Sequence, residues 1–441
     1  MSSGGQARQG PSMRVAALAS TGAAVEWYDF FLYGTAAALV FPKLFFPADM
    51  PPFVAQIASF STFLVGFIAR PIGATIFGHF GDVHGRKPAL VLAMLLMGGA
   101  TTLIGLLPTY ATVGSFAPLL LVLLRFVQGL AVGGQWGGAA LMALESAPAN
   151  RRGFYTSFVQ VGVPLGVVLV NTVFLISSAV TDSDQFMAWG WRIGFLISVV
   201  LILVALYMHW NVHEPAPSSA ADTAVAAALE PVAVQEQSRS PLLTVLRDHW
   251  RTVLLAGGAF IANNVCFYVA ITYAVAYGTS TVGVSREVLL FAVMAGSVVM
   301  IPALIVCGAM SDRYGRIGIF MWGAILSGLW AFALFPLIET ASPVAVTLAI
   351  AIMLVFVSMM YGPQAALFAE LFPKHVRYSG ASLGYQIGSV FGGGFAPIIA
   401  TALFHEFGTS LPISLYLFAV CFISLVSIMV LKARSRAHAH E

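Results

Sequence analysis

Residues 15–40, VAALASTGAAVEWYDFFLYGTAAALV, form the first long apolar stretch of the chain and carry two carboxylates, Glu26 and Asp29, near its middle. A helix that crosses a bilayer needs about 20 mostly apolar residues. A charge near the bilayer centre costs roughly 2.5 to 3.5 kcal/mol on insertion scales, so such groups usually face a polar cavity inside a helical bundle. The stretch therefore predicts a transmembrane helix whose two acidic residues have a function.

The composition extends this prediction to the whole chain. Of the 441 residues, 59% are hydrophobic and only 9% are charged, and the mean hydropathy is +0.89. A soluble globular domain carries about 25% charged residues. We therefore predict an all-α membrane protein with twelve transmembrane helices. The apolar segments begin near residues 14, 53, 88, 116, 153, 190, 250, 287, 316, 343, 377 and 411.

Basic residues lie mostly in alternate loops. By the positive-inside rule these loops and both chain termini are expected on the cytoplasmic side of the cell inner membrane. The net charge of +3 gives no reason to expect a nucleic-acid partner. The N-terminal tail shows no signal-peptide cleavage pattern, so the first helix is expected to remain in the mature protein. The loops in question contain Arg86, Lys87, Arg151, Arg152, Arg247, Arg251, Arg313, Arg316, Lys374 and Arg377.

A polar segment, residues 211–248, divides the apolar segments into two groups of six. We predict a tail over residues 1–13, helical bundles over 14–210 and 249–432, a cytoplasmic linker between them, and a second tail over 433–441. The two groups share motifs. Residues 78, 82, 85 and 86 (Gly, Asp, Gly, Arg) recur at 308, 312, 315 and 316, and Gln160 recurs as Gln386. Two parallel repeats that rock around a site between them are a transporter architecture.

At this point a family resemblance can be stated. Residues 78–87, GHFGDVHGRK, resemble the loop signature of the major facilitator superfamily. Residues 26–30 (EWYDF), 70–73 (RPIG), 189–192 (WGWR) and 377–380 (RYSG) resemble its metabolite:proton symporters, which include shikimate, α-ketoglutarate, citrate and proline/betaine permeases. Shikimate-permease-like members look most similar. The resemblance implies a secondary transporter that imports a small organic acid by proton symport with alternating access.

The fourth predicted helix departs from the family pattern. Residues 133–138 read GGQWGG, whereas the family usually has a glutamate at the position of Gln135. An amide cannot carry a proton. A proton-independent facilitator and a zwitterion or osmolyte permease therefore remain alternatives.

The first and fourth helices carry the predicted charge site. Glu26, Asp29 and Tyr33 lie on one stripe of the first helix because they are three and four residues apart. Arg125 on the antiparallel fourth helix is expected at the same depth, where an ion pair with Asp29 would lower the cost of both charges. Asp29, with Glu26, would carry the proton, and Arg125 would bind a substrate carboxylate. Alternatively the pair only fixes helix packing.

Other polar residues are candidates for the substrate site or for a cytoplasmic gate. Arg70 could guide an anion inward, but we slightly favour its snorkelling to the membrane surface. Neutral side chains could bind substrate or could equally form interhelical hydrogen bonds. These are Tyr33, Gln128, Gln135, Gln160, Asn263, Asn264, Tyr268, Tyr361, Gln364 and Gln386. Ion pairs among charged residues are predicted to close a cytoplasmic gate. The gate comprises Gly78, Asp82, Gly85, Arg86, Glu145, Asp312, Arg313, Arg316 and Glu370.

Enzymatic and metal chemistry are not expected. Cys266, Cys307 and Cys421 are far apart in apolar segments, which favours packing roles over a metal site or a disulfide framework. The chain has no phosphate-binding GxxxxGK[ST] loop and no HExxH motif. We expect no cofactor apart from the coupling proton, and a monomer in the lipid bilayer that transports an organic anion. Glycine clusters at 162 and 166 and at 392–394 are expected to permit close helix contacts.

Overall fold

The computed structural model describes residues 13–84, 86–133, 147–211, 245, 247–372 and 377–438. Within these ranges every regular element is helical. Each of the twelve predicted segments coincides with a helix or a series of consecutive helices that begins within two residues of the predicted start. The all-α prediction is therefore confirmed, because long apolar runs in a bilayer must satisfy their backbone hydrogen bonds internally.

The first half of the chain contains the helices that correspond to the first six predicted segments, with short helical turns between some of them. In order, these are α1 (Met13–Leu39), α2 (Phe41–Leu44), α3 (Pro52–His84), α4 (Arg86–Leu106), α5 (Tyr110–Val113), α6 (Phe116–Gly133), η1 (Ala149–Arg151), α8 (Arg152–Val180), α9 (Ser183–Gln185), η2 (Phe186–Gly190) and α10 (Arg192–Asn211).

The second half repeats this arrangement, and two of its helices contain π-helical turns, as η2 of the first half also does. They are the series α13 (Trp250–Tyr268), η3 (Val269–Tyr273), α14 (Ala274–Tyr277) and η4 (Gly278–Val282), and the series α18 (Arg377–Ser389), η5 (Val390–Gly394) and α19 (Ala396–Phe407). Such turns are frequent at functional sites. The other helices are α15 (Arg286–Tyr314), α16 (Arg316–Glu339), α17 (Pro343–Leu371) and α20 (Leu411–His438). Helix α20 continues to His438, beyond residue 432, where the bundle was predicted to end.

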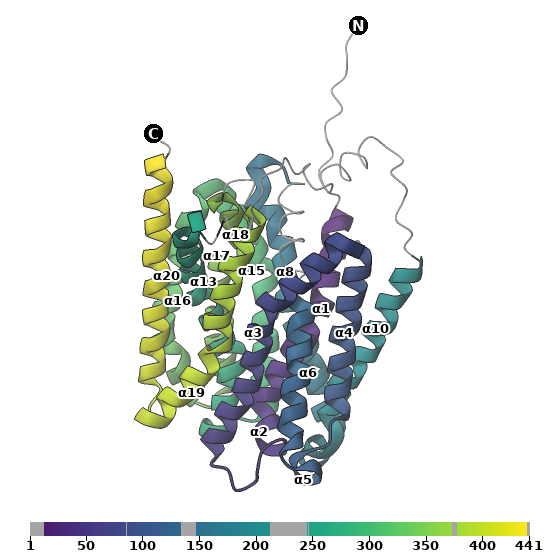
Figure 1. Cartoon of the computed structure of the whole chain (residues 1–441). Coiled ribbons are helices and arrows are strands. Elements are labelled where there is room, and N and C mark those ends of the chain that lie inside the picture. The colour runs from purple at the N-terminus through teal and green to yellow at the C-terminus, as the bar shows by residue number, and fades with distance from the viewer. Residues whose placement is uncertain are drawn as a thin grey trace.

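Nine helices of the described residues are long and apolar enough to cross a membrane. The other three main helices, α1, α4 and α10, have part of their side chains outside the described residues. The start of α1 and the end of α20 lie at the same end of the bundle (Figure 1), as an even number of crossings requires.

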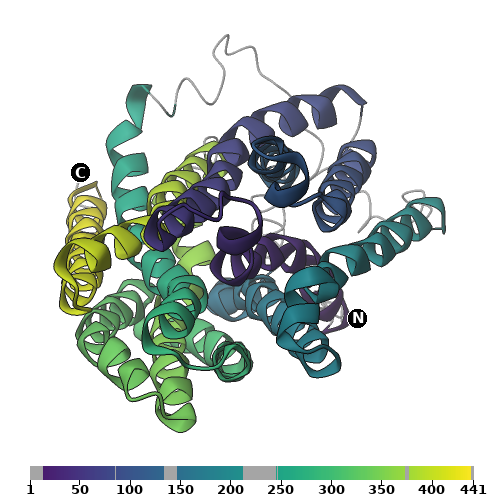
Figure 2. The ribbon, with the colours of Figure 1, turned by 90° about the horizontal axis from the view of Figure 1, so that it is seen from below.

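The two halves lie side by side and meet along two seams. Viewed along the helix axes, the purple-to-teal first half and the green-to-yellow second half occupy opposite sides (Figure 2). One seam is α8 against α15 and α17, and the other is α3 against η5 and α19. Helices α1 and α13 both contribute side chains to a cavity between the halves.

Aromatic rings and glycines explain the close contact between helices. Phe67 of α3 packs edge to face on Tyr268 of α13, with ring centroids 5.3 Å apart. A side chain at Gly166 would overlap Trp27 of α1, and one at Gly392 would overlap Asn264 of α13. The prediction that the glycine clusters permit close helix contacts is therefore confirmed.

Candidate functional site

Asp29 lies buried where α1, α4 and α10 meet. Its side chain is only 3% exposed. The Ser198 hydroxyl of α10 donates to Asp29 Oδ1 at 2.5 Å. The Thr101 hydroxyl of α4 lies next to this carboxylate and donates to the Met97 carbonyl oxygen at 2.8 Å. No described cation forms an ion pair with it. The only stabilising partners of Asp29 in this part of the chain are thus neutral hydroxyl groups.

Arg125 of α6 is fully buried in a different environment. Its guanidinium carbon lies 4.2 Å from the ring centroid of Phe30 and 4.3 Å from that of Tyr33. Nη1 donates to Gln128 Oε1 at 3.1 Å. The expected direct ion pair between Arg125 and Asp29 is wrong for this structure. Two polar side chains lie between the charges, and Arg125 hydrogen-bonds to one of them instead.

These two side chains are Gln128 and Thr101. Gln128 Nε2 donates to Thr101 Oγ1 at 2.7 Å, and Thr101 in turn contacts Asp29. Arginine can only donate hydrogen bonds, so the oxygen of the Gln128 amide must face Arg125 and its NH₂ group must face Thr101. Hydrogen bonds therefore lead from Arg125 through Gln128 to Thr101, which lies next to Asp29 inside the first half.

Arg70 of α3 is a second fully buried cation, so the snorkelling that we favoured is wrong. Its guanidinium carbon lies 5.2 Å from the ring centroid of Trp27, 5.1 Å from Phe30 and 5.7 Å from Phe67. The ring of Tyr385, from α18 in the second half, completes the enclosure at 5.8 Å. A guanidinium is weakly hydrated and packs well against aromatic faces, which explains how the charge is held inside the bundle.

The two guanidinium groups have donors that no described neighbour uses. Arg70 Nε, Arg125 Nε and Arg125 Nη2 are buried without a hydrogen-bond partner. Phe30 contacts both cations, so they lie close together. An unpaired buried charge is strongly unfavourable, and two close cations increase that cost. The described core is thus electrostatically suited to an anion.

A small cavity lies between the halves next to these cations. It is lined by Trp27, Phe31, Val163, Phe260, Asn263, Asn264, Phe267, Tyr268, Met300, Val357, Tyr361 and Tyr385. Asn263 Oδ1 and Asn264 Nδ2 are buried without a partner. Their unused acceptor and donor give the cavity wall the capacity to hydrogen-bond a polar ligand.

The cavity includes some of the predicted substrate residues and leaves out others. Asn263, Asn264, Tyr268 and Tyr361 line it. Gln128 is internal to the first half, and Tyr33 donates to Thr62 at 2.7 Å while it contacts Arg125.

The other predicted glutamines do not line the cavity. Gln160 Nε2 lies 3.5 Å from the Tyr361 carbonyl oxygen, which is a marginal hydrogen bond. Gln364 and Gln386 are buried, and both have side-chain atoms without a partner. Gln135 and the side chain of Glu26 lie outside the described residues.

Three residues of the site were not singled out by the sequence. Thr101, Ser198 and Tyr385 are polar members of apolar helices that contain many similar residues. Only the burial of a charged partner distinguishes them. For Arg70 a signal was present, because it lies far from either end of α3.

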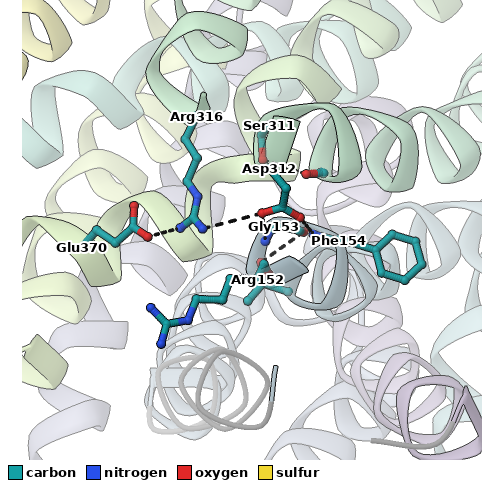
Figure 3. A network of polar contacts seen from close by, with 9 residues as sticks. Arg152, Gly153, Phe154, Ser311, Asp312, Arg316 and Glu370 are labelled. Atoms are coloured by element: carbon teal, nitrogen blue, oxygen red, sulfur yellow. Dashed lines mark hydrogen bonds and ion pairs between the residues drawn. The ribbon is translucent and has the colours of Figure 1, made fainter. Parts of the chain in front are cut away.

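The predicted gate lies at the end of the bundle where α1 begins. The Asp312 carboxylate accepts hydrogen bonds from the backbone N–H groups of Gly153, at 2.8 Å, and Phe154, at 2.9 Å (Figure 3). These are the first N–H groups of α8, which have no partner within the helix and attract negative charge. Arg316 Nη2 lies 3.6 Å from Asp312 Oδ1, and Arg316 Nη1 lies 2.6 Å from Glu370 Oε1. The contact between the halves is therefore a carboxylate on a helix N-terminus, whereas the ion pairs lie within the second half.

Other predicted gate residues do not join this cluster or are not described. Arg313 is exposed and its guanidinium stacks on Tyr314. Gly315 has a φ of +89°, a conformation that favours glycine and allows α15 to turn directly into α16. Gly85 and Glu145 lie outside the described residues. The structure also does not describe the side chains of Asp82 and Arg86 or the burial of Gly78.

At the opposite end of the bundle a larger hollow separates the halves. It is bounded by α2 and the start of α3 on one side and by α14, η4 and α19 on the other. At its edge the rings of Phe53 and His405 stack with centroids 3.5 Å apart. The two halves thus contact each other differently at the two ends of the bundle.

The comparisons with known proteins agree with this architecture. Residues 19–397 match the sequence profile of the Major Facilitator Superfamily. The chain belongs to the Major Facilitator Superfamily. It is therefore a multi-pass membrane protein and a secondary transporter of a small molecule.

Relatives in this superfamily align over nearly the whole chain. The shikimate transporter of Escherichia coli K12 is 42% identical over 96% of this chain and 95% of its own length. The inner membrane metabolite transport protein YhjE of the same organism is 41% identical over 93% and 91%. A proline/betaine transporter of E. coli is 31% identical over 94% and 82%. A solved D-xylose-proton symporter superposes with a TM-score of 0.73 at 17% identity, covering 95% of this chain and 97% of that one.

Proposed function

We propose that this transporter imports a small organic anion together with protons across the cell inner membrane, by alternating access, with both termini in the cytoplasm. The observation that carries the proposal is the pair of buried cations at the cavity. Arg70 and Arg125 are 1% and 0% exposed and have unused donors. Asp29 is the only carboxylate buried near them among the described residues.

Arg125 is the better candidate for direct binding of a carboxylate. Its Nε and Nη2 are both without a partner, and these two groups form one edge of the guanidinium fork. That edge matches the two oxygens of a carboxylate in a bidentate pair. Gly66 faces this edge, and a side chain at that position would overlap the guanidinium. The glycine thus keeps the binding edge of Arg125 unobstructed.

Asp29 is the candidate proton carrier. Its carboxylate is buried, accepts a hydrogen bond from the hydroxyl of Ser198 and lies next to the hydroxyl of Thr101. Both hydroxyls can donate to the ionised form, and both can accept from the protonated form. Asp29 can therefore change its protonation state without leaving a buried polar atom unpaired.

The two ends of the bundle support alternating access. Asp312 connects the second half to α8 at the end that we assign to the cytoplasm. The hollow beside Phe53 and His405 lies at the end that we assign to the outside. We infer that Asp312 releases the N-terminus of α8 when the site opens inward, because few other polar contacts cross between the described halves at that end.

A zwitterion permease is the second candidate, for a specific reason. Aromatic rings surround much of the cavity, and aromatic cages recognise quaternary ammonium groups. One of the relatives is a proline/betaine transporter. However, Arg70 already places a guanidinium among Trp27, Phe30 and Tyr385. A second cation next to it would be repelled, so we favour an anion.

Uptake into proteoliposomes tests the proposal. The purified chain is reconstituted and offered radiolabelled shikimate, α-ketoglutarate, citrate and proline betaine, with and without an inward proton gradient. We expect accumulation of an acid above its external concentration only with the gradient. Equilibration that is independent of the gradient would instead show a facilitator, in keeping with Gln135, and accumulation of proline betaine alone would show a zwitterion permease.

The remaining expectations stay as predictions. We expect a monomer, no cofactor other than the proton, and no nucleic-acid partner.

A further inference from the structure

The polar side chains that lie between Arg125 and Asp29 have no assigned role in binding or in proton uptake. We propose that Gln128 and Thr101 are positioning residues that couple the occupancy of Arg125 to the protonation of Asp29. The proposal rests on the proposed function, because it takes Arg125 as the anion site and Asp29 as the proton site.

The contacts form an unbroken path across three helices. Arg125 Nη1 donates to Gln128 Oε1, and Gln128 Nε2 donates to Thr101 Oγ1. Thr101 reaches the Asp29 carboxylate. Gln128 is 1% exposed and Thr101 is 0% exposed, so water does not compete for these groups. A hydrogen bond in such a low-dielectric environment strengthens its neighbours, and a change at one end is felt at the other.

Thr101 can act as the switching element of this path. A hydroxyl has one hydrogen, and two acceptors lie within its reach. One is the backbone carbonyl oxygen of Met97, at 2.8 Å, and the other is the Asp29 carboxylate. An ionised Asp29 attracts the hydrogen of Thr101, because a charge-assisted bond is roughly twice as strong as a neutral one. A proton taken up by Asp29 removes that attraction, and Thr101 then donates to Met97.

The state of Thr101 reaches Arg125 through Gln128. When Thr101 donates to ionised Asp29, its oxygen carries more negative charge and holds the Gln128 amide more firmly. The polarised amide oxygen then holds Arg125 Nη1. When Asp29 is protonated this hold weakens, and Arg125 is better able to turn toward a substrate carboxylate. In the balanced step, one proton from the outside adds to Asp29, the anion binds Arg125, and both leave together on the inside. The physical consequence is ordered loading, with the proton before the anion.

The neighbouring threonine provides a matched control. Thr102 lies on the same helix, and its hydroxyl donates to the Gly98 carbonyl oxygen of its own helix at 2.9 Å. Thr101→Val and Thr102→Val each remove one hydroxyl and keep the side-chain shape. If the hydroxyl of Thr101 matters only for helix stability, the two variants should behave alike.

The test measures two activities of the full-length chain in proteoliposomes. The probe is radiolabelled shikimate or whichever acid of the panel the wild type accumulates. Counterflow exchange without a proton gradient reports binding and alternating access. Accumulation driven by an inward proton gradient of one pH unit reports coupling. For symport of one proton per neutral complex, that gradient supports about tenfold accumulation. We expect Thr101→Val and Gln128→Leu to exchange substrate but to reach a ratio of inside to outside concentration of only about one. Thr102→Val should accumulate substrate as the wild type does.

Two results would overturn the proposal. The first is accumulation by Thr101→Val at the wild-type level. The second is loss of both counterflow and accumulation in Thr101→Val, which would mean that Thr101 has a structural role. Failure of the proposed function is distinguishable, because the wild type itself would then show no accumulation that depends on the gradient.

Discussion

Ser198 of α10 donates a hydrogen bond of 2.5 Å to Asp29 of α1, and these residues are far apart in the sequence. The bond fixes the buried carboxylate toward α10 and away from direct contact with Arg125. It also explains why the acidic residue can lie near the centre of an apolar helix, since a buried charge requires hydrogen-bond partners.

Asp29→Asn should remove proton coupling without unfolding the protein. The amide keeps the size of the side chain and can still accept from Ser198, but it cannot be protonated. We expect accumulation driven by the gradient to fall to about onefold while counterflow persists. Asp182→Asn is the control, because Asp182 only caps a short surface helix. Wild-type accumulation by Asp29→Asn would remove Asp29 from the mechanism.

Gly66→Ala should impair anion binding. The added methyl group would overlap Nε and Cζ of Arg125 and push the guanidinium away from its binding position. Overpacking of this kind costs about 1 to 3 kcal/mol, so we expect substrate affinity to fall roughly five- to a hundredfold. The measurement is ligand binding in detergent together with the melting temperature. Gly99→Ala serves as the control because no atom lies within 4 Å of a side chain placed there. Equal affinities for the two variants would contradict the assigned position of Arg125.

Arg70→Lys should reduce transport although it keeps the charge. The planar guanidinium contacts four rings, and a lysine cannot stack on them in the same way. Desolvated cation–π contacts are worth about 2 kcal/mol, so a loss of roughly tenfold or more in kcat/KM is expected from initial uptake rates. Arg251→Lys changes an exposed arginine that stacks on Trp250 and should leave uptake unchanged. An Arg70→Lys protein with normal uptake would show that the aromatic enclosure has no functional role.

Asp312→Ala should loosen the contact between the halves at the gate. The variant leaves the N–H groups of Gly153 and Phe154 without their carboxylate partner. Hydrogen bonds to a charged group contribute about 1.5 to 3 kcal/mol, so these amides should exchange with deuterium roughly ten- to a hundredfold faster. Arg313→Ala is the matched control, since Arg313 is exposed and forms no ion pair within the described residues. Unchanged protection in Asp312→Ala would exclude this contact as part of the gate.

The sequence was sufficient to predict the helices and much of the list of polar candidates. Apolar segments of spanning length and a repeated motif are local signals, so they could be read without tertiary contacts. It was not sufficient to predict which polar groups meet. Asp29 and Arg125 were expected to pair because they lie at similar depth, but depth does not specify the rotation of each helix about its axis. The structure places Gln128 and Thr101 between them.

The sequence also does not specify whether the side chain of Arg70 is buried or reaches the membrane surface. Its position in the sequence allows either a buried or a snorkelling side chain, because a long flexible chain can reach the surface from some depth. Only the packing of Trp27, Phe67 and Tyr385 around it decides the question.

The sequence by itself determined that this chain is a twelve-helix membrane protein built from two repeats, with ionisable groups in the first repeat. Hydrophobicity and periodicity act locally, so every residue contributes to that result in its own segment. The tertiary structure alone decided that Asp312 caps α8, that Arg70 is enclosed by rings from both halves, and that Arg125 reaches Asp29 through two neutral side chains. These contacts join residues from different helices, and their geometry depends on helix rotation and packing that no single segment encodes.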